Sequence, residues 1–255
     1  MFDLAGLAPV TFALALAITL AAGVVKGAVG FAMPLVMISG LSTIMDPKLA
    51  LATLIIPVLV TNALQTFRGG LSEALDAARE FWRYLLVVCL AIILTAQMVA
   101  FIPSQAFYLV LGVPVVILSA IQLVGLRLHI APQNRVRAEW GIGLISGALG
   151  GLAGTWGPTT VLYLLAIDTP KMRQMVVQGV IYGTGSIALV AAHLKSGLLN
   201  AETAPFSALM VVPGLLGMWI GFKVQDRMDA ALFRKATLAV LIVAGLNLVR
   251  RGIMG

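Results

Sequence analysis

The chain has 255 residues, of which 60% are hydrophobic and 11% are charged, and its formal net charge is +7. A mean hydropathy of +1.04 with repeated apolar runs excludes a soluble domain and indicates a helical protein that crosses a membrane several times. The basic residues lie between apolar runs, where they set topology, so the positive charge does not indicate nucleic acid as a partner. The single cysteine, Cys89, excludes an intramolecular disulfide.

Ten helical elements are predicted, five in each half of the chain. In the first half they span residues 7–27, 31–45, 48–67, 82–101 and 106–126. In the second half they span residues 139–153, 156–167, 172–193, 205–222 and 232–249. The second element of each half is too short to cross a bilayer upright, which takes about 20 residues, so each is expected to form a hairpin with the element before it. A surface helix over 71–83, capped by Ser72, is also expected.

A glycine-rich stretch lies where each predicted hairpin turns, and its pattern recurs after 124 residues. The recurring positions are Gly23, Gly27, Gly30 and Pro34, then Gly147, Gly151, Gly154 and Pro158. Glycine and proline interrupt helices, and irregular backbone inside a membrane must be buried in protein or line a wet cavity. The repetition predicts one interrupted helix in each half. For any single glycine, close packing between helices is an equally favoured explanation.

The basic residues are distributed unequally if each hairpin returns to the side from which it enters. Twelve then lie on one side and four on the other, and Lys26 lies within the membrane. The positive-inside rule places the loops 68–81, 127–138 and 223–231 in the cytoplasm and both termini outside the cytoplasmic (inner) membrane. Each half crosses three times, which predicts two inverted-topology repeats, 1–126 and 139–255, joined by a cytoplasmic linker, 127–138. Full crossing by all ten elements would preserve the inversion, so the choice between re-entrant and crossing hairpins stays open.

The two interruptions together predict an anion site. Pro34 and Pro158 suit the first turn of a restarting helix, where free N–H groups and the positive end of the helix dipole attract negative charge. Lys26 lies within the first interruption, and a lysine at bilayer depth costs about 3 kcal/mol. Its counterpart after 124 residues is Gly150, so packing does not require the charge. The alternative is that Lys26 ends the first helix and reaches to the surface.

The candidate substrate-binding residues are those of the two interruptions and the polar or aromatic side chains expected to face them: Lys26, Gly27, Gly30, Phe31, Met33, Pro34, Asn62, Gln65, Gly154, Thr155, Trp156, Gly157, Pro158, Thr159, Gln178 and Tyr182. For the polar members of the third helix in each half, hydrogen bonding between helices is an equally favoured role. No intramembrane carboxylate is evident, so no proton-coupling residue is identified. No catalytic, metal-ligand or nucleotide-binding motif appears, so neither an enzyme nor a cofactor is expected.

These residues resemble the TauE/SafE sulfite exporter family, within the sulfonate-uptake permease superfamily. The resemblance lies in the duplicated glycine-rich stretch followed by Pro-Leu (Gly23 to Leu35), in the Pro47-Lys48 turn before an Ala-x-Ala-Thr segment (Ala50 to Thr53), and in the basic ending of each half. It implies a membrane transporter of sulfite, sulfonates or other sulfur-containing or organic anions. The family's Thr-Ser pair is Thr53-Leu54 here, which is a departure from the pattern.

The predicted function is therefore a secondary transporter, working as an exporter, of a small organosulfonate or sulfite. Phe31, Met33 and Trp156 make the predicted site bulkier and more apolar than sulfite needs, which favours an organosulfonate with a short carbon chain. Membrane lipid is the expected surrounding, with protons as a candidate coupling ion and a homodimer as a candidate assembly. A transporter of a non-sulfur organic anion and a non-transporting membrane scaffold or assembly factor are the alternatives.

Overall fold

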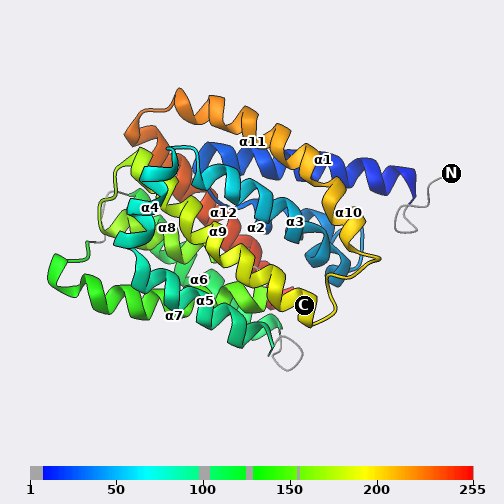
Figure 1. The fold of residues 1–255 in the computed structure, drawn as a ribbon, viewed down its shortest axis with the longest axis horizontal. Coiled ribbons are helices and arrows are strands. Elements are labelled where there is room, and N and C mark those ends of the chain that lie inside the picture. The colour runs from blue at the N-terminus through cyan, green and yellow to red at the C-terminus, as the bar shows by residue number, and fades with distance from the viewer. Residues whose placement is uncertain (1–7, 98–103, 125–128, 154–155, 255) are drawn as a thin grey trace.

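The structure is a computed structural model that describes residues 8–97, 104–124, 129–153 and 156–254, and these form a bundle of long and short helices (Figure 1). In chain order the helices are α1 (Pro9–Val29), α2 (Met33–Leu41), α3 (Pro47–Thr66), α4 (Leu71–Glu80), α5 (Trp82–Ala96), α6 (Ser104–Leu123), α7 (Arg135–Ala153), α8 (Gly157–Ala166), α9 (Lys171–Lys195), α10 (Ala204–Leu209), α11 (Val211–Asp226) and α12 (Ala230–Met254), with a 3-10 turn, η1 (Pro132–Asn134), before α7. The described residues contain no strand, which confirms the predicted all-α class.

The bundle has the length and surface of a membrane protein. Within the described part of the chain, five helical stretches are long and apolar enough to cross a membrane: Pro9–Val29, Lys48–Thr66, Lys171–Lys195, Ala204–Asp226 and Ala230–Met254. Its outer surface carries large apolar side chains, such as Leu94 and Val243, which are 67% and 68% exposed. Lipid tails accommodate such a surface, so the protein is a multi-pass membrane protein.

Two predicted details are corrected by the structure. The stretch predicted as one helix over 205–222 is divided at Met210 into α10 and α11. Pro213 explains the break, because its ring conflicts with the carbonyl of Leu209, four residues earlier. Ser72 does not cap α4, because that helix begins after Gly70, whose φ is 91°, and no side chain caps its first turn.

The glycine stretches form two seams of closely packed parallel helices. Helix α1 packs along α11, and a Cβ atom at Gly27 would lie 2.8 Å from the Cα of Gly221. Helix α7 packs along α5, and a Cβ at Gly151 would lie 2.5 Å from the carbonyl oxygen of Ile92. Gly23 and Gly27 therefore do not interrupt a helix as predicted. They lie inside a continuous α1, and the interruption follows at Gly30.

The remaining long helices pair between the two halves of the chain. Helix α3 packs along α9 and α6 along α12. A shift of 124 residues relates α1 to α7, α3 to α9 and α5 to α11, and in each of these three pairs the two helices run in opposite directions across Figure 1.

The two short helices run back along the helices that precede them. A Cβ atom at Gly40, near the end of α2, would lie 2.7 Å from the side chain of Ile18, midway along α1. The carbonyl oxygen of Ala166, at the end of α8, accepts a hydrogen bond of 2.9 Å from the N–H of Ile130, just before α7. Each short helix therefore returns toward the end of the bundle where its hairpin begins.

Candidate anion site between two helix starts

The first interruption is a short left-handed segment between α1 and α2. Gly30 has φ of 87° and closes α1, and Ala32 has φ of 73° and precedes the first residue of α2. A positive φ strains a residue with a Cβ, so Ala32 is held in this conformation by its surroundings. Pro34 is the second residue of α2, where its missing N–H leaves no backbone acceptor unpaired.

The second interruption ends at Trp156, which precedes α8. Gly157 and Pro158 form the first turn of that helix, in the same arrangement as Met33 and Pro34 in α2. The predicted site residues Gly154 and Thr155 lie outside the described residues.

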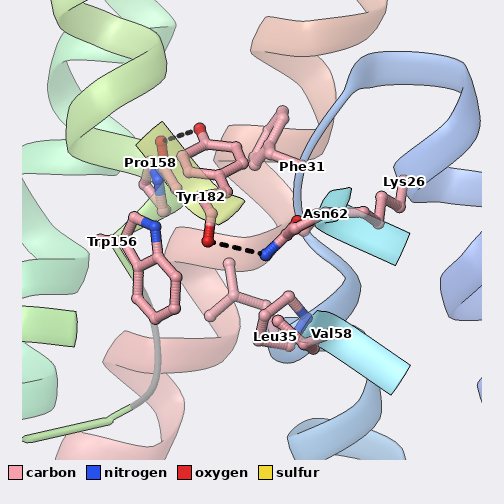
Figure 2. A pocket seen from close by; sticks show the side chains of 11 residues that line it. Lys26, Phe31, Leu35, Val58, Asn62, Trp156, Pro158 and Tyr182 are labelled. Atoms are coloured by element: carbon pink, nitrogen blue, oxygen red, sulfur yellow. Dashed lines mark hydrogen bonds between the residues drawn. The ribbon is translucent and has the colours of Figure 1, made fainter. Parts of the chain in front are cut away.

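The starts of α2 and α8 meet at one cavity of about 20 Å³ (Figure 2). Eight of the predicted residues line it: Lys26, Phe31, Pro34, Asn62, Trp156, Gly157, Pro158 and Tyr182. The positive ends of two helices that belong to different halves of the chain therefore face the same small space.

Lys26 supplies a buried amine to this cavity. Its side chain lies in the last turn of α1 and is 1% exposed, so it does not reach the surface, and that alternative is wrong. The Nζ atom donates a hydrogen bond to Oδ1 of Asn62 and lies 5.9 Å from the ring centroid of Tyr182. None of the ion pairs among the described residues includes Lys26. A buried cation without a carboxylate partner is costly, so this position favours an anionic guest.

Asn62 and Tyr182 hold the cavity walls in place. The Nδ2 of Asn62 donates to the backbone carbonyl of Tyr182 at 3.0 Å, and the hydroxyl of Tyr182 donates to the carbonyl of Gly157 at 3.1 Å (Figure 2). Asn62 thus links Lys26 to α9, and Tyr182 links α9 to the start of α8. The Asn62–Tyr182 bond therefore connects the two halves directly at the site, while the Tyr182–Gly157 bond fixes α9 to α8 within the second half.

Trp156 contributes a free hydrogen-bond donor. Its side chain is 3% exposed and lines the cavity, and its Nε1 has no hydrogen-bond partner among the described residues. A buried donor without a partner is unfavourable, so it is suited to a ligand oxygen.

The structure places six other predicted residues beside the cavity, outside its lining: Gly27, Gly30, Met33, Gln65, Thr159 and Gln178. Gly27 belongs to the α1–α11 seam. The sulfur of Met33 lies 3.4 Å from the hydroxyl of Thr61. Thr159 lies 2.6 Å from the Ser146 hydroxyl and supports the start of α8. The Nε2 of Gln65 donates a hydrogen bond of 3.0 Å to the backbone carbonyl of Gly30.

Gln178 lies against Gly30, and neither its amide nitrogen nor its amide oxygen has a partner among the described residues. It is fully buried. Together, Gln65, Gln178 and Gly30 form a polar cluster beside the cavity.

Three lining residues, Ala32, Leu35 and Val58, were not predicted. Their small or aliphatic side chains carry no chemical signal. The 124-residue repeat would have found all three, because it relates them to the predicted residues Trp156, Thr159 and Tyr182.

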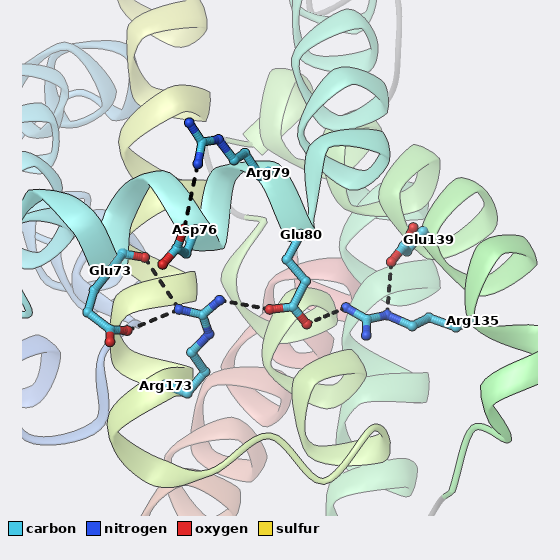
Figure 3. A network of polar contacts seen from close by, with 7 residues as sticks. All are labelled: Glu73, Asp76, Arg79, Glu80, Arg135, Glu139 and Arg173. Carbon is cyan, nitrogen blue, oxygen red and sulfur yellow. Dashed lines mark hydrogen bonds and ion pairs between the residues drawn. The ribbon is translucent and has the colours of Figure 1, made fainter.

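A network of charged residues ties together α4, α7 and α9 at one end of the bundle (Figure 3), and Arg83 joins α5 to it. The carboxylate of Glu139 is fully buried and lies 2.7 Å from Nε of Arg83 and 3.1 Å from Nε of Arg135. Glu80 accepts hydrogen bonds of 2.8 Å from both Arg135 and Arg173. Sequence reasoning missed this buried carboxylate, although Arg135 and Glu139 are four residues apart on one helix, the spacing of an ion pair.

Glu80 lies outside the membrane-spanning segments, and two opposing effects act on its pKa. Burial raises the pKa, but the hydrogen bonds and positive charges of Arg173 and Arg135 together outweigh burial and hold the pKa below its ordinary value of 4.5.

The fold and the cavity define a multi-pass, all-α membrane protein with a buried lysine between two helix starts. The model of the sulfite exporter TauE/SafE family matches residues 15–248, nearly the whole chain. The chain belongs to the TauE/SafE sulfite exporter family, which is a family of transporters of sulfur-containing anions. Comparisons with curated proteins and with solved structures give no match.

Proposed function

We propose that the protein is a secondary transporter that exports a small organosulfonate or sulfite across the cytoplasmic membrane. The anion binds between the starts of α2 and α8, beside Lys26. The observation that carries this proposal is the buried amine of Lys26, which has no carboxylate partner among the described residues and lies where two helix N-termini meet. Helix starts and a lysine attract an anion without a permanent negative charge in the protein.

The available donors match a sulfonate group. A sulfonate is ionised at neutral pH and presents three acceptor oxygens, which suits several convergent donors. Lys26 Nζ, Trp156 Nε1 and the first-turn N–H groups of the two short helices provide them. A cavity of about 20 Å³ holds about one water-sized group, so binding requires Lys26 to exchange Asn62 for the anion and the neighbouring side chains to move apart.

We further propose that residues 1–126 and 139–255 are inverted repeats joined by the linker 127–138. The opposite directions of corresponding helices support this arrangement (Figure 1). In an inverted-repeat transporter the site is exposed to one side at a time. The charged network of Figure 3 then closes the cytoplasmic end, and Gln65 and Gln178 lie between the cavity and that end.

Substitution of Lys26 tests the site. We expect Lys26→Met to weaken binding of sulfite and of short sulfonates about 100-fold, because a hydrogen bond to a charged group is worth up to about 3 kcal/mol. Lys48→Met is the matched control, since Lys48 is exposed at the start of α3. Binding is measured by thermal stabilisation of the purified protein with sulfite, sulfoacetate, isethionate, taurine and sulfolactate. Transport is measured in proteoliposomes.

The alternatives give different results in the same experiment. Stronger stabilisation by the carboxylate analogues than by the sulfonates indicates a carrier of a non-sulfur organic anion. Absence of binding and flux with every anion, equal in wild type and Lys26→Met, indicates a scaffold. Equal effects of Lys26→Met and Lys48→Met contradict a buried anion site.

The proposed orientation, with both termini outside, has its own test. A cysteine introduced at Gln133, in a Cys89→Ala background, is expected to be protected from membrane-impermeant thiol reagents in intact cells. Labelling there would reverse the orientation.

A further inference from the structure

A second, larger cavity lies on the outer side of the α1–α2 hairpin. It is a groove of about 500 Å³ whose walls come from α1, α2 and α12. It arises because α12 packs along α6 and meets α1 and α2 at only a few positions. Its lining is aliphatic apart from Ser39 and Asn247.

The groove is separated from the anion cavity by two side chains. Ala32 and Leu35 line both spaces, and Val25, which lines the groove, directly precedes Lys26. Ala32 contributes only a methyl group, and the flexible side chain of Leu35 can change rotamer. A ligand held at Lys26 would therefore have its carbon atoms next to the thinnest part of the wall.

We propose that this groove receives the apolar tail of the transported anion, so that the substrate class includes alkanesulfonates with several methylene groups. The proposal rests on the proposed function. The sulfonate head binds at Lys26 and the two helix starts, and the alkyl chain passes Leu35 into the space between α2 and α12. Burial of methylene groups in this aliphatic lining favours the longer chain, while the anion cavity alone has no room for it.

A chain-length series tests the proposal with protein in lipid nanodiscs, which avoids detergent tails. The probes are sulfite, methanesulfonate, butanesulfonate and hexanesulfonate. We expect the wild-type dissociation constant to fall about fourfold for each added methylene, the factor that burial of one methylene gives. Ala244→Phe places a large side chain in the groove and should abolish this gain while leaving sulfite and methanesulfonate binding unchanged.

Leu246→Phe is the matched control, because Leu246 lies on the same helix, is 52% exposed and is absent from the groove lining. It should retain the full chain-length gain, which separates binding in the groove from partition into the lipid. Ala239→Phe, at the exposed rim of the groove, replaces Ala244→Phe if that variant does not fold.

Two results would overturn the proposal. Equal affinity from methanesulfonate to hexanesulfonate, or the same gain in wild type and in both groove variants, means that the tail does not lie in the groove. In both cases sulfite and methanesulfonate still bind, so the proposed function is not contradicted. Loss of all anion binding in the wild type would instead remove the proposed function and this inference with it.

Discussion

The hairpins α1–α2 and α7–α8 share a backbone pattern but differ at two decisive positions. Both have closely packed glycines, an interruption, and a short helix with proline as its second residue. Where the first hairpin has Lys26 and Ala32, the second has Gly150 and Trp156. A Cβ at Gly150 would lie 2.9 Å from the indole of Trp156, so that glycine makes room for the ring. The pair of hairpins thus encloses a cavity with a lysine on one wall and an aromatic donor on the other.

A second difference separates the two ends of the molecule. The repeat relates Ala15 in α1 to Glu139 in α7. Ala15 lies in an apolar cluster with Phe206 and Met210, while Glu139 is buried in the charged network. Opening the end that contains Ala15 would expose apolar side chains to water, which is unfavourable. Opening the end that contains Glu139 would expose charged groups, which water can hydrate. The positions that the two halves share therefore form the common framework, and the positions that differ give the cavity its lysine and indole and one end of the bundle its buried carboxylate.

The largest expected effect tests the shared framework. Gly27→Ala and Gly151→Ala should each destabilise the protein by about 3 kcal/mol, the upper range for overpacking, because each new Cβ meets backbone atoms that cannot move aside. Thermal unfolding, followed by size-exclusion chromatography after heating, measures the loss. Gly141→Ala is the matched control, since a Cβ there has no neighbour within 4 Å. Destabilisation by only one of the two substitutions would show that the seams are not equivalent.

The next effect tests the difference between the ends. Glu139→Gln should destabilise the protein by about 2–3 kcal/mol, because it leaves Arg83 and Arg135 without their buried carboxylate. The expected loss is below that of a wholly buried pair, since both arginines are about one-third exposed. Melting temperature is the readout, with Glu202→Gln in an exposed loop as the control. An unchanged melting temperature would mean that the network does not hold this end closed.

A smaller effect tests the aromatic wall of the cavity. Trp156→Phe keeps a ring but removes the Nε1 donor, so sulfite and methanesulfonate should bind about tenfold more weakly, which is the value of one hydrogen bond to a charged group. Trp219→Phe, at an exposed position on α11, serves as the control in the same thermal-stabilisation assay. Unchanged binding by Trp156→Phe would leave this residue with a packing role only.

The smallest expected effect concerns pH. The pKa of Glu80 is lower in the folded protein than its ordinary value of 4.5, so its ion pairs stabilise the protein fully above that value and are lost as the pH falls through the folded pKa. Exposed pairs are screened by solvent, so the contribution is at most about 1 kcal/mol. The melting temperatures of wild type and Glu80→Gln should differ at neutral pH and converge in acid. A constant difference would assign the effect to packing.

The sequence predicted the helices and eight of the residues that line the cavity, because both leave local signals. Apolar runs locate the membrane helices, and glycine and proline mark the places where helices stop and restart. A lysine in an apolar run is costly enough to indicate function, and the structure places Lys26 in the cavity. The 124-residue repeat relates the two interruptions to each other in the sequence itself.

Other features depend on contacts between distant segments and leave no local signal. Gly27 belongs to a seam with α11, which only packing reveals. Leu35 and Ala32 line the cavity because two hairpins meet there, and Glu139 is buried because Arg83 comes from another helix to pair with it.

The sequence by itself determined an all-α membrane protein with two related, interrupted helices and one costly lysine, because hydropathy and helix-breaking residues act locally along the chain. Only the tertiary structure decided that both helix starts face Lys26, that a groove adjoins them and that a buried carboxylate ties one end together. Those outcomes depend on which helices pack side by side, and packing joins residues that are far apart in the chain.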